Sequence, residues 1–136
     1  MNNEMLVVIG AGGIGQAIAR RQGPGRHILL ADINQDALAT AATALHELGH
    51  RVTTHRVDVS SRESVHALAH TATELGPVVQ VAHSAGLSPV QASPAAILAV
   101  DLLGTALVLD EFGRVIAPRR GWDRDLQHGR AHVPAV

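Results

Sequence analysis

Three glycines near the amino terminus have the spacing of a phosphate-binding turn. Gly10, Gly12 and Gly15 follow the apolar run Val7-Val8-Ile9 and fit the pattern G-x-G-x-x-G. In this pattern the first glycine forms a tight turn, the second lets the backbone approach a pyrophosphate, and the third lets a helix pack on a strand. The free N–H groups at the start of that helix stabilise anions, so we expect phosphate groups to bind here. The alternative is a turn whose glycines serve only the packing of helix on strand.

A carboxylate follows the next apolar run of the chain. The run His27-Ile28-Leu29-Leu30-Ala31 has the composition of a buried strand, and Asp32 comes directly after it. A dinucleotide site places its ribose-binding carboxylate at this point. Such a carboxylate accepts hydrogen bonds from both ribose hydroxyls and repels a 2′-phosphate, and no arginine follows Asp32 directly. The sequence therefore favours NAD over NADP, unless Asp32 is only a solvated residue at a strand end.

The elements that must position these residues alternate between strands and helices. Hydrophobic patterns and turn residues place strands near residues 7–9, 27–31, 51–57 and 78–82, and helices near residues 14–22, 36–48, 61–75 and 93–116. Strands that alternate with helices of this length form βαβ units with right-handed crossovers. We therefore predict an α/β fold, a doubly wound parallel sheet of order 3-2-1-4 with two helices on each face.

The spacing of apolar residues predicts the buried side of each helix. In the first helix the residues with helical spacing are Ile14, Ala17, Ile18 and Arg21. In the second helix they are Leu38, Ala41, Ala42, Leu45 and Leu48. Ser60 and Glu63 have the spacing of a capping box, which predicts Ser60 as the N-cap of the third helix. Gly104 is expected to be a point of close packing in the last helix.

Together these residues resemble the amino-terminal half of a short-chain dehydrogenase/reductase, over residues 5–117. The resemblance rests on the glycine turn, Asp32, Asp58-Val59, Ala85-Gly86 and the run Val100-Asp101-Leu102-Leu103-Gly104-Thr105. It implies a truncated Rossmann-like sheet and an NAD-binding domain in residues 1–117. It also implies an oxidoreductase that transfers hydride between NAD and an alcohol or carbonyl compound.

The same resemblance implies which residues contact the cofactor. Asp32 and Ile33 would lie at the adenosine ribose, and Asp58 and Val59 at the adenine. The segment His83-Ser84-Ala85-Gly86 would lie under the ribose and the nicotinamide. The residues implied at the phosphates are Gly10, Gly12, Gly13, Ile14 and Gly15.

The catalytic residues of that family have no counterpart in these 136 residues. The family's mechanism resembles general acid catalysis by a tyrosine whose pKa is lowered by a lysine four residues later. The sequence contains neither tyrosine nor lysine, and Asp101 stands at the position of the family's relay asparagine. The glycine turn is also one residue shorter than usual. We therefore expect a cofactor-binding chain without turnover.

Two other functions stay open at this point. One is a non-catalytic module that senses a dinucleotide or binds a partner. The other is an α/β-hydrolase, because His83-Ser84-Ala85-Gly86 after an apolar strand is similar to a nucleophile elbow. Ser84 would then be the nucleophile, and the candidate triad partners are Asp101, Asp110, His128 and His132.

Composition and charge exclude several classes of protein. The net charge of -1 gives no basic face for nucleic acid or for an anionic membrane. The first four residues lack the basic region of a signal peptide, and Asp101 and Asp110 interrupt the most apolar later segment. We therefore expect a cytoplasmic protein without a membrane span. There are no cysteines, which excludes thiol chemistry. Histidine pairs at i, i+4 spacing lack a third ligand and predict no metal site: His46/His50, His66/His70 and His128/His132.

The sequence changes character after Pro118. Residues 118–136 have neither helical nor strand period, and we interpret them as an irregular tail. If the codons of Arg119 to Ala131 are read one base later, the shifted codons can encode glycines, an apolar strand and Ser-Ser. This shifted translation resembles the next strand of the family. We therefore infer a shifted reading frame, and the alternative is a naturally divergent polar tail. A stop codon soon after the shift in the coding DNA would contradict the shifted frame. Because the family's sheet continues past the fourth strand, we also expect a homo-oligomer through the open edge or the long helix.

Overall fold

The computed structural model of the chain describes residues 3–84 and 104–116, which form a parallel sheet between two layers of helices. The strands are β1 (Met5–Ile9), β2 (His27–Asp32), β3 (Arg51–Arg56) and β4 (Val78–His83). The helices are α1 (Gly13–Gln22), α2 (Gln35–Glu47), α3 (Arg62–Leu75) and α5 (Thr105–Gly113). The strand order is β3-β2-β1-β4, which confirms the predicted fold class and sheet order.

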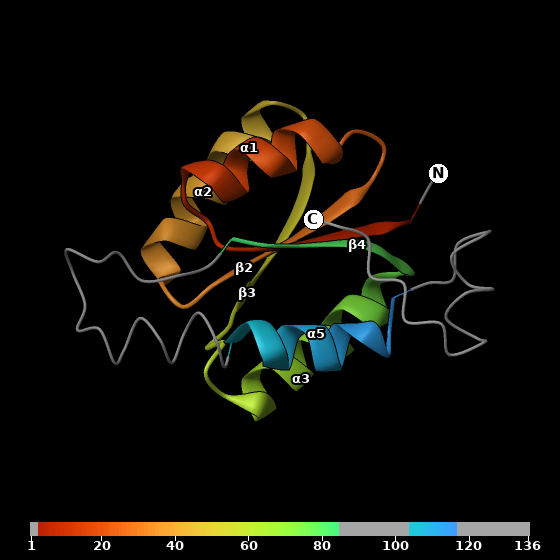
Figure 1. Ribbon diagram of the computed structural model, residues 1–136. Coiled ribbons are helices and arrows are strands. Elements are labelled where there is room, and N and C mark those ends of the chain that lie inside the picture. The colour runs from red at the N-terminus through yellow and green to blue at the C-terminus, as the bar shows by residue number, and fades with distance from the viewer. Residues whose placement is uncertain (1–2, 85–103, 117–136) are drawn as a thin grey trace.

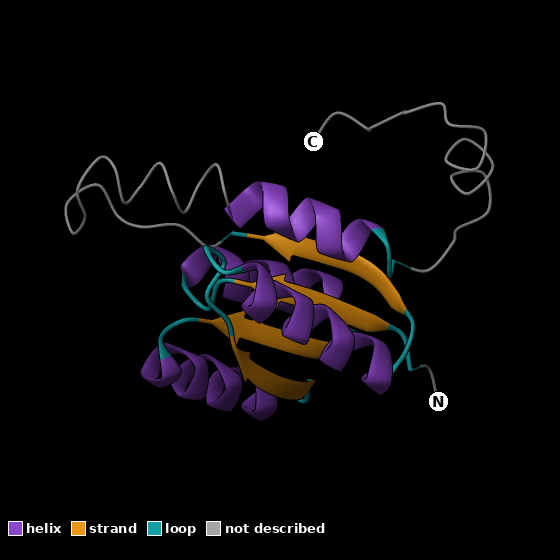
Figure 2. Cartoon of the chain, turned by 90° about the horizontal axis from the view of Figure 1, so that it is seen from below, coloured by secondary structure: helices purple, strands orange, loops and turns teal. Residues whose placement is uncertain are grey.

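The two helical layers lie on opposite faces of the sheet. Helices α1 and α2 cover one face, and α3 and α5 cover the other (Figure 1). Figure 2 shows the four strands side by side. Val8 of β1 pairs in parallel with Leu30 of β2 and with Ala82 of β4. Because all pairings are parallel, the carboxyl ends of the strands lie at one edge of the sheet.

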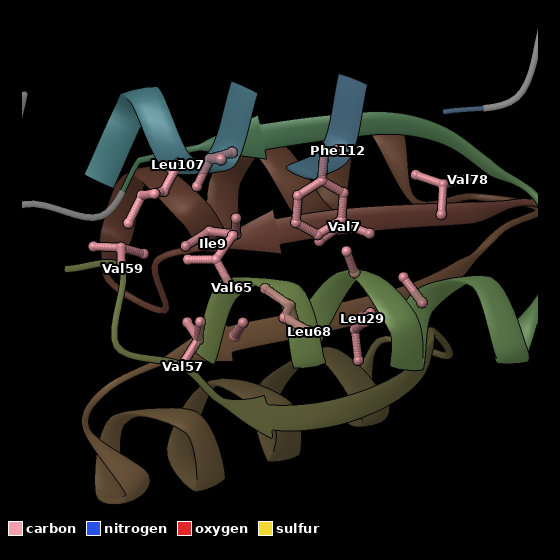
Figure 3. Close-up of a cluster of buried hydrophobic side chains, with 14 of the residues drawn as sticks. Val7, Ile9, Leu29, Val57, Val59, Val65, Leu68, Val78, Leu107 and Phe112 are labelled. Carbon is pink, nitrogen blue, oxygen red and sulfur yellow. The ribbon is translucent and has the colours of Figure 1, made fainter. Parts of the chain in front are cut away.

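Side chains of the central strand alternate between two cores. Met5, Val7 and Ile9 belong to the core beneath α3 and α5, which Figure 3 shows. Leu6 and Val8 belong to the core beneath α1 and α2. All five side chains are fully buried. A strand covered on both faces buries every residue, which explains why β1 is a continuous apolar run.

The buried side of α1 differs from the predicted one. Gly15 and Ala19 are buried, whereas Ile14 is 72% exposed. Ala17 and Arg21 are exposed as well. The close approach of Gly15 to the preceding turn sets the rotation of the helix, so helical spacing of apolar residues alone gave the wrong face. Ile14 is thereby left exposed beside the glycine turn.

Helix α2 follows the prediction except at its end. Its predicted inner residues Leu38, Ala41, Ala42 and Leu45 are buried. Leu48 is the C-cap and is 62% exposed. Gly49 follows with φ 90°, a left-handed conformation that ends the helix as a glycine after the C-cap does.

Helix α3 begins one residue later than predicted. Its N-cap is Ser61, whose hydroxyl accepts a hydrogen bond from the backbone N–H of Ser64 at 3.2 Å. Ser60 binds the carboxylate of Asp58 instead. The predicted capping box at Ser60 is therefore wrong, because Asp58 competes for the Ser60 hydroxyl.

Helix α5 ends earlier than predicted. The predicted helix reached Ile116, but α5 ends at Gly113 and Ile116 forms a parallel bridge with Val78 of β4. Residue 116 therefore already pairs with the sheet. Several predictions lie outside the described residues. They concern the earlier part of the predicted long helix, the residues Ala85, Gly86 and Asp101, and the predicted tail with its shifted frame.

Candidate functional site

The glycine turn after β1 holds helix α1 close to the sheet. The backbone N–H of Gly10 donates to the carbonyl of Ala31 at 2.7 Å, and Gly10 has φ 119°. A Cβ on Gly15 would overlap the carbonyl oxygen of Gly10. Both positions therefore require glycine, as the first and third residues of the pattern should.

The other glycines of the turn leave open space. A Cβ built on Gly12 or on Gly13 would have no heavy atom within 4 Å. Gly12 is the N-cap of α1, and no side chain caps the helix there. The N–H groups in the first turn of a helix have no acceptor within that helix. A pyrophosphate therefore fits this turn in both space and hydrogen bonding.

Asp32 lies against the glycine turn. Its Oδ2 accepts a hydrogen bond from the backbone N–H of Ala11 at 2.8 Å, and its Oδ1 accepts one from Asn34 at 2.9 Å. Each carboxylate oxygen has a further lone pair with which it could accept a ribose hydroxyl. The neighbouring Ile33 is 51% exposed. Asp32 is therefore a positioned carboxylate rather than a freely solvated one.

Asp58 begins the turn that leads into α3. Its Oδ1 accepts hydrogen bonds from the Ser60 hydroxyl at 2.6 Å and from the Ser60 backbone at 3.0 Å. The hydroxyl and the N–H of Ser60, in that order, hold the pKa of Asp58 below its ordinary value. Asp58 thus has a structural role at the start of the next helix.

Val59 and Gly104 form a close contact between the two parts of the described chain. Val59 is buried, and a Cβ on Gly104 would lie 2.9 Å from its Cγ2. The prediction of close packing at Gly104 is confirmed. Its partner Val59 was not predicted, since no local pattern reports contacts between residues this far apart in the sequence.

Ser84 lies beside the glycine turn at the end of β4. Its backbone N–H and its hydroxyl both donate to the carbonyl of Ile9, at 2.8 and 3.2 Å. A Cβ on Gly15 would come within 3.1 Å of the Ser84 oxygen. This hydroxyl is engaged by a backbone carbonyl, so the described residues give no support to Ser84 as a hydrolase nucleophile.

Backbone hydrogen bonds join the carboxyl ends of neighbouring strands. Ser84 donates to Ile9, Gly10 donates to Ala31, and Val57 donates to Asp32 at 3.0 Å. The sheet therefore brings the glycine turn, Asp32, Asp58 and the end of β4 to a single edge. The described residues contain no cluster of His, Asp or Glu that could hold a metal ion. They also contain no helix long and apolar enough to cross a membrane.

Comparison with known proteins identifies the family. The family model described as short chain dehydrogenase matches residues 4–102. The chain belongs to the short-chain dehydrogenase/reductase family. A short-chain dehydrogenase/reductase of Alternaria brassicicola is 48% identical over 116 residues, which are 85% of this chain and 42% of that protein. The chain thus spans less than half the length of this relative.

Solved structures of short-chain dehydrogenases/reductases share the fold. One from Burkholderia phymatum in complex with NAD is 30% identical, has a TM-score of 0.70, and matches 85% of this chain and 44% of its own. An alcohol dehydrogenase from Thermococcus sibiricus complexed with 5-hydroxy-NADP is 29% identical, with a TM-score of 0.67 over 84% of this chain and 53% of its own. The family fold therefore accommodates both kinds of nicotinamide cofactor.

Proposed function

We propose that this chain binds NAD at the carboxyl edge of its sheet, as the cofactor-binding half of a short-chain dehydrogenase/reductase. The observation that carries the proposal is the open glycine turn beside the carboxylate of Asp32. Space at Gly12 and Gly13 and the uncapped start of α1 suit a pyrophosphate. Asp32, tied to the same turn by Ala11, suits the ribose next to it.

Each group of the site would hold a different part of the cofactor. The first turn of α1 would bind the phosphates, and Asp32 the adenosine ribose. The side chains of Ile14, on α1, and of Ile33, directly after β2, are exposed and offer apolar surface to the cofactor. Asp58 and Val59 would lie at the adenine. When bound, NAD supplies a hydride acceptor.

The preference for NAD over NADP depends on charge at the ribose. Asp32 would repel a 2′-phosphate. Arg56 of β3 pairs in register with Asp32 and is exposed, so a cation also stands at this edge of the sheet. Because Asp32 is held against the glycine turn by hydrogen bonds, we expect it to dominate. Asp32→Ala should narrow the affinity advantage of NAD over NADP. Arg56→Gln should widen that advantage, because it removes a cation from the edge of the sheet where the 2′-phosphate would lie.

Calorimetric titration of the whole chain with NAD and NADP tests the proposal. Gly12→Ala puts a methyl group into open space without strain, since Gly12 has φ -77°. We expect it to weaken NAD binding about tenfold or more, by displacing hydrogen bonds to a charged group. The matched control is Gly113→Ala on α5, which also enters open space. The proposal would be contradicted if the unmodified chain bound NADP as tightly as NAD or more tightly. It would also be contradicted if Gly12→Ala and Gly113→Ala weakened NAD binding equally.

We further propose that this chain of 136 residues binds the cofactor without turnover. A positioned acid typically contributes roughly 10² to 10⁴ to the rate, and the sequence has no tyrosine or lysine to form the family's relay. We expect no oxidation of alcohols above background with NAD. Activity that Asp101→Ala abolishes would reveal a different relay.

A further inference from the structure

The side chain of Gln16 reaches back from α1 to the glycine turn. Its Nε2 donates a hydrogen bond to the backbone carbonyl of Ala11 at 3.0 Å. A carbonyl oxygen only accepts hydrogen bonds, so the amide nitrogen of Gln16, and not its amide oxygen, faces Ala11. The backbone N–H of Gln16 donates to the carbonyl of Gly12 at 2.9 Å. Gln16 therefore ties α1 to two consecutive residues of the turn.

Ala11 is held at both of its backbone groups. Its N–H donates to Oδ2 of Asp32 at 2.8 Å, and its carbonyl accepts the hydrogen bond from Gln16. Ala11 is only 2% exposed, and a buried carbonyl that loses its partner costs free energy. Ala11 therefore links the carboxylate of Asp32 to helix α1.

The hydrogen bond from Gln16 sets the direction of the next N–H group along the chain. Peptide bonds are planar, and the described residues contain no cis peptide bond. The carbonyl of Ala11 and the N–H of Gly12 therefore point in opposite directions, so the N–H is turned away from the Gln16 side chain. Gly12 is the N-cap of α1, and its N–H has no acceptor within that helix. Gly12 is also exposed, which gives an anion access to it.

The glycines on both sides of Ala11 leave this part of the backbone free to move. Gly10 has φ 119°, and Gly12 has φ -77° and ψ -170°. Glycine permits more φ and ψ values than any other residue, so steric limits alone do not hold the peptide between Ala11 and Gly12. A site whose donors are already oriented loses less conformational freedom when its ligand binds. The hydrogen bond from Gln16 supplies that orientation.

We propose that Gln16 is a positioning residue for the pyrophosphate of NAD, acting through the peptide between Ala11 and Gly12. The inference rests on the proposed function, in which the pyrophosphate lies at this turn. Gln16 acts by holding the N–H of Gly12 toward the phosphate and not by touching the cofactor. If its hydrogen bond served only the stability of the turn, its loss would weaken every ligand of the site alike.

Titrations of the whole chain with ADP and with adenosine, followed by the backbone ¹⁵N NMR signals, test this. The two probes share the base and the ribose, but only ADP carries phosphate groups. Gln16→Met keeps a long side chain that favours the helix, and it has no N–H donor. It should weaken ADP binding about tenfold, the effect of impairing one hydrogen bond to a charged group. Adenosine affinity should stay unchanged, because Asp32 keeps its hydrogen bonds from Ala11 and Asn34.

A second readout needs no ligand. The amide signal of Gly12 in the free chain should move in Gln16→Met, because the peptide that carries this N–H loses its restraint. Gln22→Met is the matched control, since Gln22 is an exposed glutamine at the other end of the same helix. It should change neither the Gly12 signal nor either affinity.

Gln16→Asn provides a second variant should Gln16→Met not fold. It keeps the amide but draws it back from Ala11 by one methylene, so it should also weaken ADP and spare adenosine. The inference would be overturned if both variants bound ADP as tightly as the unmodified chain, or if they weakened ADP and adenosine equally. NAD binding by the unmodified chain would then still support the proposed function. If the unmodified chain bound neither ADP nor NAD, the proposed function would fail and the inference with it.

Discussion

The glycine turn depends on the absence of a side chain at Gly15. Its missing Cβ lets α1 approach the carbonyl of Gly10, and any side chain would overlap that oxygen. We expect Gly15→Ala to lower the free energy of unfolding by about 1 to 3 kcal/mol, the usual cost of forcing an extra methyl into a packed site. Urea denaturation followed by circular dichroism measures it.

Gly13→Ala is the control for this prediction. A methyl on Gly13 enters open space at the first residue of α1, where alanine favours the helix more than glycine does. The free energy of unfolding of the Gly13→Ala variant should therefore stay the same or rise. If Gly13→Ala and Gly15→Ala lowered the free energy of unfolding equally, contact with Gly10 would not be the reason that residue 15 must be glycine.

Ser60 should stabilise the protein only while Asp58 is ionised. The Ser60 hydroxyl is the main cause of the lowered pKa of Asp58. A lowered folded pKa adds stability above the unfolded value, about 3.9, and this contribution is lost as the pH falls through the folded pKa. Ser60→Ala should therefore lower Tm at neutral pH, and the difference should vanish in acid.

Thermal unfolding across this pH range measures the effect of Ser60→Ala. Thr73→Ala is the control, because the Thr73 hydroxyl donates to the carbonyl of His70 and not to a carboxylate. Its effect on Tm should not change with pH. A Ser60→Ala difference that persists at low pH would mean that the hydroxyl acts on the fold without Asp58.

At the scale of single residues, sequence reasoning predicted the glycine turn and the carboxylate beside it, but not the contacts between them. The glycine spacing and Asp32 predicted a turn and a carboxylate at one edge, because both follow from local sequence. The hydrogen bond from Ala11 to Asp32 joins two strand ends and depends on their pairing. The N-cap at Ser61 was missed because Asp58 competes for Ser60, a choice that motif spacing does not report.

Helices α3 and α5 are joined by a buried carboxylate. The side chain of Glu111 on α5 is only 6% exposed, and it lies 3.4 Å from Nη1 of Arg62 and 3.2 Å from Nδ1 of His66, both on α3. Arg62 also binds Asp110 at 2.6 Å. Charged hydrogen bonds are stronger than neutral ones, so this contact orients α5 on α3.

Glu111→Gln should therefore destabilise the protein by about 1 kcal/mol, the difference between charged and neutral hydrogen bonds. Chemical denaturation gives the change in the free energy of unfolding. The control is Glu74→Gln, which removes an exposed pair with His70 within α3 and should cost about 0.5 kcal/mol or less. If Glu111→Gln and Glu74→Gln lowered the free energy of unfolding equally, burial of Glu111 would add nothing to the strength of its ion pairs.

At the scale of elements, periodicity predicted each strand and helix of the described chain and their order. It predicted the wrong face for α1, because the approach of Gly15 to the turn decides which residues of that helix meet the sheet. It also extended the last helix too far. The pairing of Ile116 with Val78 ends that helix, and such pairing is set by the sheet rather than by local sequence.

The described part of the molecule has an apolar groove along β4. In that part, β4 pairs with β1 on one side and with Ile116 at Val78 on the other. A hollow of about 240 Å³ lies between β4 and α5, lined mainly by apolar side chains that include Phe112 and Leu109. Leu109 is 68% exposed. The chain spans 42% of its relative from Alternaria brassicicola, so more than half of that protein has no counterpart here.

We therefore predict that this chain associates with itself through the β4 and α5 groove. Exposed strand edges and contiguous apolar surface favour pairing with another chain. Leu109→Lys places a charge on that surface without entering the core, and it should shift the chain towards monomer in sedimentation velocity at high concentration. The matched control is Leu48→Lys, which replaces a leucine that is 62% exposed at the end of α2. If the unmodified chain were a monomer, or if both variants shifted it towards monomer equally, the groove would not be the site of association.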